Sequence, residues 1–189
     1  MTTAITQPIN EIATKWQLDA AHANVEFAVR HLMISSVKGR FGDIAGAITL
    51  DPENSGAASV DVTLQTASID TRQEQRDAHL RSADFFDAEK WPTITFRGNR
   101  VAGDTDSEFL LFGDLTIRDV TRPVILEVTK EGEGSDPWGN FRVAYSAKTK
   151  IDRRQFGLTY NQALETGGVV VGDEIKISVD AEFTAVPNA

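Results

Sequence analysis

The sequence predicts an all-β protein, an extended eight-stranded antiparallel β-barrel with one short α-helix inserted between strands. Two observations carry this prediction: about eight segments alternate apolar and polar residues, and no helix-length crossover separates them. Alternating strands bury one face and expose the other, whereas parallel neighbours would need long crossovers. A closed barrel gives all the buried faces one shared interior. A two-sheet sandwich would show the same alternation and is the alternative fold.

The expected strands follow from period-two alternation along the chain. Val25, Phe27 and Val29 alternate with polar or small residues, which is typical of a strand with one buried face. In order, strands are expected near residues 16–20, 25–29, 40–50, 60–65, 92–97, 109–117, 124–128, 141–151 and 175–183. Glycines within 40–50 coincide with a change of phase and indicate a bulge. Residues 31–39 lose the alternation and are expected to form a compact loop or a short turn of helix.

One segment, residues 66–91, has helical rather than strand periodicity. Thr71 and Glu74 have the spacing of a capping box, so the helix is expected to begin there. Asp77 is placed four residues before Arg81 and is expected to pair with it on a solvated face.

Three potential cations share the other face of this helix. Arg72, Arg76 and His79 are spaced i, i+4 and i+7, so helical geometry aligns them. Such a stripe could bind an anion, because guanidinium groups match phosphate oxygens. The same stripe is also typical of an ordinary solvated helix, and the sequence alone does not choose between the two.

Composition limits the class of protein. The 189 residues fit one domain, with residues 1–15 expected as a flexible N-terminal tail and 16–189 as the barrel. A net charge of −9 argues against nucleic-acid binding, and against an anionic membrane attracting the chain as a whole. No apolar run reaches membrane-spanning length and no export signal is recognisable, so a cytoplasmic protein without stable membrane insertion is expected, unless a signal has been removed.

The sequence offers little catalytic or metal-binding chemistry. There is no cysteine, and the three histidines do not share a metal-binding spacing. None of the common hydrolase, phosphate-loop or dinucleotide motifs is present. We therefore expect no catalytic residue, no metal site and no cofactor.

The interior of the expected barrel is apolar. Eight strands leave a space that is either filled by side chains or wide enough for one slender ligand, and the alternation leaves both possibilities open. With almost no polar atom inside, a ligand would have to be an apolar chain, stabilised by roughly 0.8 kcal/mol per buried methylene. The residues expected to line the interior are Val25, Phe27, Val29, Phe41, Ile48, Val62, Leu64, Leu80, Phe85, Phe86, Ile94, Phe96, Leu115, Ile117, Val143, Tyr145, Phe156, Ile177 and Val179.

Several motifs occur in an order that points to a known family. They are Asp19-x-x-His22, Val25-x-Phe27-x-Val29-Arg30-His31-Leu32, Gly39-Arg40-Phe41, Ser68-Ile69-Asp70-Thr71, Arg76-Asp77-x-His79-Leu80-Arg81-Ser82-x-Asp84-Phe85-Phe86, Trp91-Pro92-x-Ile94-x-Phe96, Gly113-x-Leu115-Thr116-Ile117-Arg118-x-Val120-Thr121-Arg122-Pro123 and Arg154-x-Phe156-Gly157. Through them the chain, from about Trp16 to its C-terminus, resembles the YceI family of lipocalin-like polyisoprenoid-binding proteins.

This resemblance implies a carrier or storage protein rather than an enzyme. Members are described as holding a polyprenyl diphosphate or an isoprenoid quinone inside the barrel, and a homodimer is possible. The headgroup is then expected at Arg72, Arg76 and His79, with Arg154 as a weaker second candidate. Many members are exported, and this chain departs from them in showing no signal.

Two alternatives stay open on the sequence. One is an enzyme that modifies a lipid at the barrel mouth, with His79 acting beside Asp77 or Asp84. The other is a ligand-free barrel that serves as an interaction module.

Overall fold

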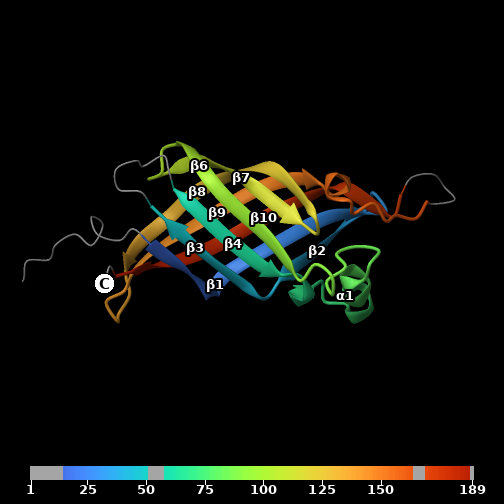
Figure 1. The fold of residues 1–189 in the computed structure, drawn as a ribbon, viewed down its shortest axis with the longest axis horizontal. Helices are drawn as coiled ribbons and strands as arrows, with labels where there is room; N and C mark the ends of the chain where they lie inside the picture. The colour runs from blue at the N-terminus through green and yellow to red at the C-terminus, as the bar shows by residue number, and fades with distance from the viewer. Residues whose placement is uncertain (1–14, 51–57, 164–168, 188–189) are drawn as a thin grey trace, which may run out of the picture.

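The computed structural model describes residues 15–50, 58–163 and 169–187, which form an elongated barrel with one helix at an end (Figure 1). The strands are β1 (Lys15–His31), β2 (Ser35–Phe41), β3 (Ile44–Thr49), β4 (Ser59–Gln65), β5 (Ile69–Asp70), β6 (Thr93–Gly103), β7 (Glu108–Ile117), β8 (Val120–Ser135), β9 (Phe141–Asp152) and β10 (Val171–Val186). The helices are α1 (Glu74–Arg81) and the single 3-10 turns η2 (Thr66–Ser68) and η3 (Arg153–Phe156). The expected tail lies almost wholly outside the described residues.

Eight of these strands close into a ring. Antiparallel pairing runs in the order β10-β9-β8-β7-β6-β4-β3-β1, and β1 then pairs with β10. The predicted barrel is therefore confirmed and the sandwich alternative is wrong, because a sandwich would leave free sheet edges. We call the end that carries α1 the α1 end, and the opposite end the far end (Figure 1).

Where a bulge is expected within residues 40–50, the structure has an interruption between two strands that both pair with β1. β1 pairs with β3 through residues 15–17 and with β2 through residues 25–31. The strand is interrupted at Gly42 and Asp43, between β2 and β3. β2 and the short β5 then extend the sheet at the α1 end.

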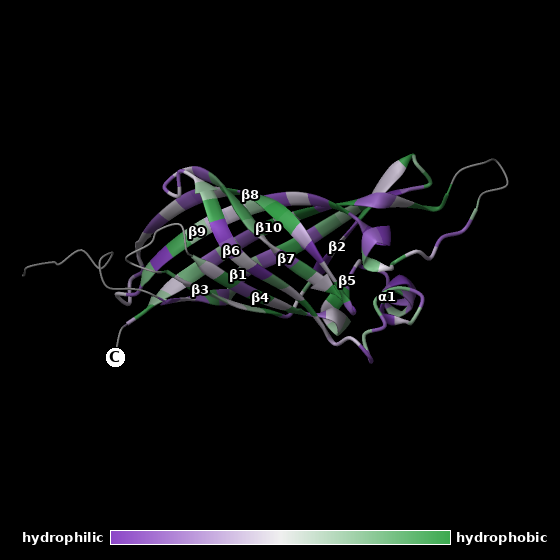
Figure 2. Cartoon of the chain, turned by 45° about the horizontal axis from the view of Figure 1, so that its top comes forward, coloured by the Kyte–Doolittle hydropathy of each residue, from purple (hydrophilic) through white to green (hydrophobic). Residues whose placement is uncertain are grey.

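The strand register brings the predicted apolar positions to one inner face. Phe27 lies directly opposite Ile177 across β1 and β10, and Val62 lies opposite Phe96 across β4 and β6. Directly paired residues of antiparallel strands point to the same side of the sheet. Figure 2 shows the resulting alternation of hydrophilic and hydrophobic positions along the wall. We call this apolar face the inner wall.

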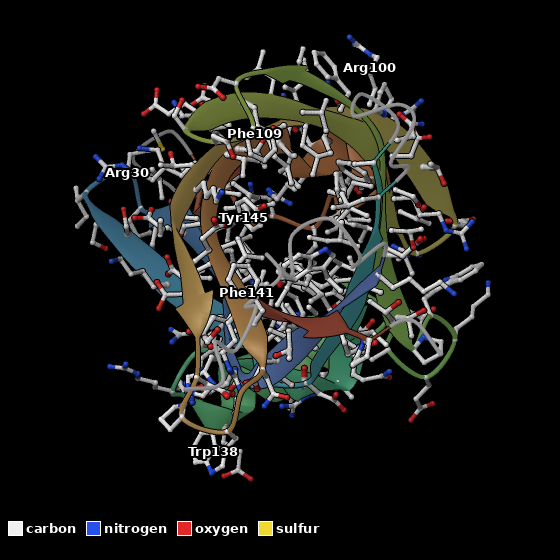
Figure 3. The ribbon with its side chains drawn as sticks, turned by 90° about the vertical axis from the view of Figure 1, so that its left-hand side faces the viewer. Arg30, Arg100, Phe109, Trp138, Phe141 and Tyr145 are labelled. Carbon is white, nitrogen blue, oxygen red and sulfur yellow. The ribbon has the colours of Figure 1, made fainter. Side chains whose placement is uncertain are left out.

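Several inner-wall side chains in the middle of the barrel are only partly buried. Val62, Phe96, Tyr145 and Val179 pack against the apolar core yet keep some accessible surface. In a barrel filled by its own side chains, such positions would be close-packed and inaccessible. Their exposure indicates free space beside them. Figure 3 looks along the barrel from the far end, with Phe109 and Tyr145 on the inner side of the wall and Arg100 and Trp138 outside.

Two facing glycines make room for one of these aromatic rings. Gly98 and Gly113 are directly opposite on β6 and β7. A Cβ built on Gly113 would lie 2.6 Å from Cζ of Phe96, and one on Gly98 would lie 3.2 Å from its Cε1. The Phe96 ring therefore rests against backbone where other residues would place a side chain.

The expectation for residues 31–39 was wrong. They form a tight hairpin in which β1 turns at Leu32 and Met33 and returns as β2. The turn was missed because its residues are apolar, whereas tight hairpin turns favour Asn, Asp and Gly.

The expected start of the helix was also wrong. Helix α1 begins at Glu74, and the N-cap is Gln73, whose side chain accepts a hydrogen bond from the Arg76 N–H. Thr71 cannot cap the helix because its hydroxyl donates instead to the Asp77 carboxylate. Asp77 is accordingly buried and does not pair with Arg81, which donates to backbone carbonyls of η2 and β5.

An ion-pair cluster on the outer surface links β1 to β9 and β10. Nη1 of Arg142 lies 2.6 Å from the Asp19 carboxylate and 3.0 Å from that of Glu182, and its Nε lies 2.9 Å from Asp136. The hydrogen bond from Arg142 is the largest cause that lowers the pKa of Asp19 to about 2. The cluster spans the place where β1 bulges away from β10 between Leu18 and Ala23.

This cluster predicts a specific acid sensitivity. Because the folded-state pKa of Asp19 is below its ordinary 3.8, the ion pair stabilises the fold above pH 3.8 and this contribution disappears as the pH falls towards 2. Urea unfolding across that window should show a smaller loss of stability for Asp19→Asn than for the wild type. Asp180→Asn removes an exposed carboxylate of the same sheet and should behave like the wild type; equal behaviour of the two variants would contradict the assignment.

Candidate functional site

A pocket of about 290 Å³ opens at the α1 end of the barrel. Its walls come from the end of the inner wall, from α1 with the turn after it, and from the chain that follows η3. The lining residues are Phe27, Val29, Arg30, His31, Val37, Thr71, Arg76, His79, Leu80, Phe85, Tyr160, Gln162, Val170 and Val171. About half of them are apolar, and the polar ones come from α1 and its flanks, from the end of β1 and from the segment after η3.

The buried carboxylate of Asp77 organises the first turn of α1. Its Oδ1 accepts hydrogen bonds from both the backbone N–H and the hydroxyl of Thr71. The Thr71 oxygen in turn accepts from Nε of Arg76 at 2.7 Å, and the Thr71 carbonyl accepts from Nη2 at 2.8 Å. These contacts hold the guanidinium of Arg76 at the pocket before any ligand is present.

Among the described residues, the side chain of Arg76 donates only to Thr71, which leaves some of its donors unused. A guanidinium has five N–H groups, and Thr71 takes two of them. The remaining donors can bind an anionic or carbonyl oxygen without rebuilding the side chain. A preorganised donor of this kind costs less side-chain entropy on binding than a free arginine.

His79 faces the same pocket and is held by a carboxylate and two rings. Its Nε2 lies 2.9 Å from Oδ2 of Asp84, and its ring packs edge-on against Phe85 and Tyr160, with centroids 5.1 and 4.9 Å away. Of the two partners considered for His79, Asp84 is therefore the one that contacts it, since Asp77 is bonded to Thr71.

Buried Arg153 holds the segment that brings Tyr160 to the pocket. Only 3% exposed, Arg153 donates to the carbonyls of Leu158, Tyr160 and Gly172 and lies 3.2 Å from the Asp173 carboxylate. The segment after η3 is thereby fastened to the start of β10.

The other two predicted headgroup residues lie outside the pocket lining. Arg72 is exposed, with a backbone φ of 63° and its N–H bonded to Asp70. Arg154 is exposed and pairs with Asp152 at 2.8 Å and Asp173 at 3.3 Å. Their role as headgroup ligands stays a prediction, as does that of Arg76 and His79, which the structure brings together.

The residues predicted to line the interior lie partly at this pocket and partly further inside the barrel. Phe27, Val29, Leu80 and Phe85 line the pocket. Those that lie in or against the main apolar core are Val25, Phe41, Ile48, Val62, Leu64, Phe86, Ile94, Phe96, Leu115, Ile117, Val143, Tyr145 and Phe156. Val179 packs against a smaller cluster and Ile177 continues the inner wall opposite Phe27. Contact of these residues with a ligand stays a prediction.

Sequence reasoning missed several lining residues. Arg30 and His31 end β1 at the point where the alternation is lost, and neither of them is predicted from the sequence as a site residue. Tyr160 and Gln162 lie after η3 in a segment without periodicity, so only the fold brings them to α1.

One other group of ligating side chains lies on the outer surface. Atoms of Asp19, His22 and Glu182 come within 4.8 Å of one another, which a metal ion could exploit. Arg142 already lies between the two carboxylates. The guanidinium therefore occupies the position that a cation would take.

Fold and pocket together define a class. The chain is a small closed β-barrel with an apolar inner wall and a pocket at one end that combines apolar and polar side chains, the architecture of barrels that enclose a ligand. A family model described as the YceI-like domain matches residues 16–183. The chain belongs to the YceI family, as its motifs predicted.

Individual relatives agree with this membership. Protein YceI of Escherichia coli O157:H7 is 42% identical over 149 residues, which is 78% of each chain. The crystal structure of the Campylobacter jejuni YCEI protein has a TM-score of 0.70 at 30% identity and covers 83% of this chain and 90% of its own. A domain from Saccharophagus degradans, described as polyisoprenoid binding, has a TM-score of 0.68 at 13% identity and covers 92% and 99%. That last likeness shows the fold alone.

The Asp77 network predicts a loss of stability on its removal. Asp77→Ala would leave the buried Thr71 N–H and hydroxyl without their carboxylate acceptor, at a cost of about 2–3 kcal/mol. Urea unfolding at neutral pH measures the change. Glu74→Ala, in the exposed first turn of the same helix, is the control and should cost much less; similar losses would show that the network is not the source of the stability.

Proposed function

We propose that the protein binds a long-chain isoprenoid lipid, a polyprenyl diphosphate or an isoprenoid quinone, as a carrier or storage protein. The tail lies along the inner wall and the headgroup lies in the pocket beside α1. The observation that carries the proposal is the partial exposure of apolar residues such as Val62, Phe96 and Val179 on the inner wall. An apolar chain is the ligand that gains most from covering them.

The polar groups of the pocket favour a headgroup at the α1 end. The free N–H donors of Arg76 suit a diphosphate, which accepts forked hydrogen bonds, and equally a quinone carbonyl. The Saccharophagus degradans domain is described as polyisoprenoid binding, which supports the same class of tail.

Charged side chains lie on the inner face of the wall in the described part of the far end. Lys130 lies opposite Tyr145 on the inner face of the wall, and its side chain is only 15% exposed. It is 3.1 Å from Asp106 and 2.9 Å from Glu133. Moving an apolar tail past a paired, half-buried charge cluster would be unfavourable. We therefore assign ligand entry to the α1 end.

The enzyme alternative rests on the hydrogen bond between His79 and Asp84, which could orient the imidazole for proton transfer. Among the described lining residues, the Thr71 hydroxyl is bonded to Asp77 and Arg76, and the Tyr160 hydroxyl accepts a hydrogen bond from Gln162 rather than from His79. Binding is the function that the geometry supports best. The interaction-module alternative needs a filled interior, which the accessible inner wall argues against.

A plugging substitution tests the tail site. Val179→Trp places a large side chain in the free space and should abolish lipid recovered by organic extraction and mass spectrometry while the protein stays folded. Overpacking a filled core would instead cost about 1–3 kcal/mol. Ser178→Trp, on the outward face of the same strand, is the control and should retain the lipid. Undiminished lipid in the Val179 variant would refute the tail site.

A matched pair of ligands tests the headgroup site. Arg76→Ala should weaken geranylgeranyl diphosphate by about 10- to 100-fold, since charge-assisted hydrogen bonds contribute about 1.5–3 kcal/mol. Geranylgeraniol, with the same tail and no charge, should bind the variant nearly as well as the wild type. Arg97→Ala removes an exposed arginine that pairs with Asp61 away from the pocket lining and is the control. An equal loss for both ligands in a fluorescence titration would remove Arg76 from the headgroup site.

A further inference from the structure

The tip of the β1–β2 hairpin exposes apolar side chains at the α1 end. Met33 is 57% exposed and Ile34 is 80% exposed. Within residues 15–50, 58–163 and 169–187, they are the only strongly exposed large apolar residues that are neighbours in the sequence. We call residues 32–34 the hairpin tip, and Figure 2 shows apolar colouring at this end of the hairpin.

The backbone of the hairpin tip is unfavourable for its residues. Leu32 and Met33 have φ values of 51° and 59°, and the Ile34 N–H donates to the His31 carbonyl. Positive φ at both central positions is the type I′ pattern, which Asn and Gly adopt easily and apolar residues do not. Met33 and Ile34 stay largely exposed, so the fold buries little of either side chain in return. Such a conflict between sequence and local structure is expected where a surface binds something.

The β1–β2 hairpin itself carries charge of the opposite sign to that of the chain. No acidic residue occurs between Glu26 and Asp43, whereas Arg30, Lys38 and Arg40 do, in a chain of net charge −9. Arg30 and Lys38 are exposed. Arg30 pairs with Ser36 and Lys38 pairs with Ala28, so the two cations are diagonal neighbours on the outer face of β1 and β2. Cations beside exposed apolar residues match the interface of an anionic lipid bilayer.

The base of the same hairpin is a wall of the candidate pocket. Val29, Arg30, His31 and Val37 all line it, and the tip begins at the next residue, Leu32. A surface that seats the hairpin tip would therefore lie next to the pocket opening.

We propose that the hairpin tip docks the protein on a lipid bilayer. Met33 and Ile34 enter the interface, Arg30 and Lys38 face anionic headgroups, and the pocket opens towards the membrane. None of the described helices is long and apolar enough to cross a membrane. The proposed contact is peripheral because only two apolar side chains enter the interface. The exchange of lipid between bilayer and pocket rests on the proposed function; the docking itself does not.

Vesicle co-sedimentation tests the docking. The wild type should bind vesicles of mixed phosphatidylcholine and phosphatidylglycerol, and Met33→Ser with Ile34→Ser should reduce the partition coefficient by about tenfold or more, because two apolar side chains are lost from the interface. Trp138→Ser is the control: this side chain is 81% exposed at the far end. No wild-type binding, or a larger loss from Trp138→Ser than from the double variant, would overturn the proposal.

The charge contribution has its own readout. Lys38→Gln should weaken binding to the mixed vesicles by several-fold and leave weaker binding to pure phosphatidylcholine unchanged, and added salt should abolish the difference. A double variant that turns a dimer into a monomer in analytical ultracentrifugation would instead assign the hairpin tip to self-association and overturn the proposal.

Ligand binding in solution separates the two proposals. Geranylgeranyl diphosphate should bind the double variant as tightly as the wild type, because Met33 and Ile34 do not line the pocket. Lost vesicle binding with retained ligand binding supports docking as a separate property of the hairpin tip. Loss of both in a protein that keeps its circular dichroism would overturn the docking assignment.

Discussion

Pairing of β1 with β10 is the constraint on which the rest of the structure depends. Without it the eight strands would form an open sheet with two free edges, and the apolar face would be exposed to water. Closure turns that face into an inner wall, so Phe27 lies opposite Ile177 and their neighbours follow. Because β1 has 17 residues, it also supplies partners for β2 and β3. One strand thus links the wall, the α1 end and the hairpin that extends beyond it.

The pocket arises where the chain leaves the ring at the α1 end. There the wall continues through β2 and β5 to α1, and the buried Asp77 carboxylate fixes the approach to the helix. Polar side chains can gather at this place because the apolar inner wall ends here. On the opposite side, Arg153 fastens the segment after η3 through carbonyl contacts. Two groups of hydrogen bonds from distant parts of the sequence therefore shape one opening.

Period-two alternation was sufficient to predict antiparallel strands with one buried face each, whereas the choice of a barrel over a sandwich is confirmed by the pairing of β1 with β10. The alternation was not sufficient where local chemistry departs from the usual rules. The hairpin turn at Leu32 and Met33 was missed because its residues are apolar. Thr71 has the spacing of a helix cap, but its hydroxyl donates to Asp77 instead. Helical spacing aligned Arg72 with Arg76, but Arg72 precedes the helix and does not line the pocket. The contribution of Tyr160 needed the fold itself, since no pattern in its segment relates it to α1.

The facing glycines Gly98 and Gly113 determine where the Phe96 ring lies on the inner wall. With hydrogen in place of a side chain, they form a flat recess in which the ring of Phe96 lies against the wall. A methyl group at either position would displace the ring towards the barrel axis. The room that the inner wall leaves beside Phe96, and with it the bulk of the apolar ligand proposed above, therefore depends on two residues that have no side chain.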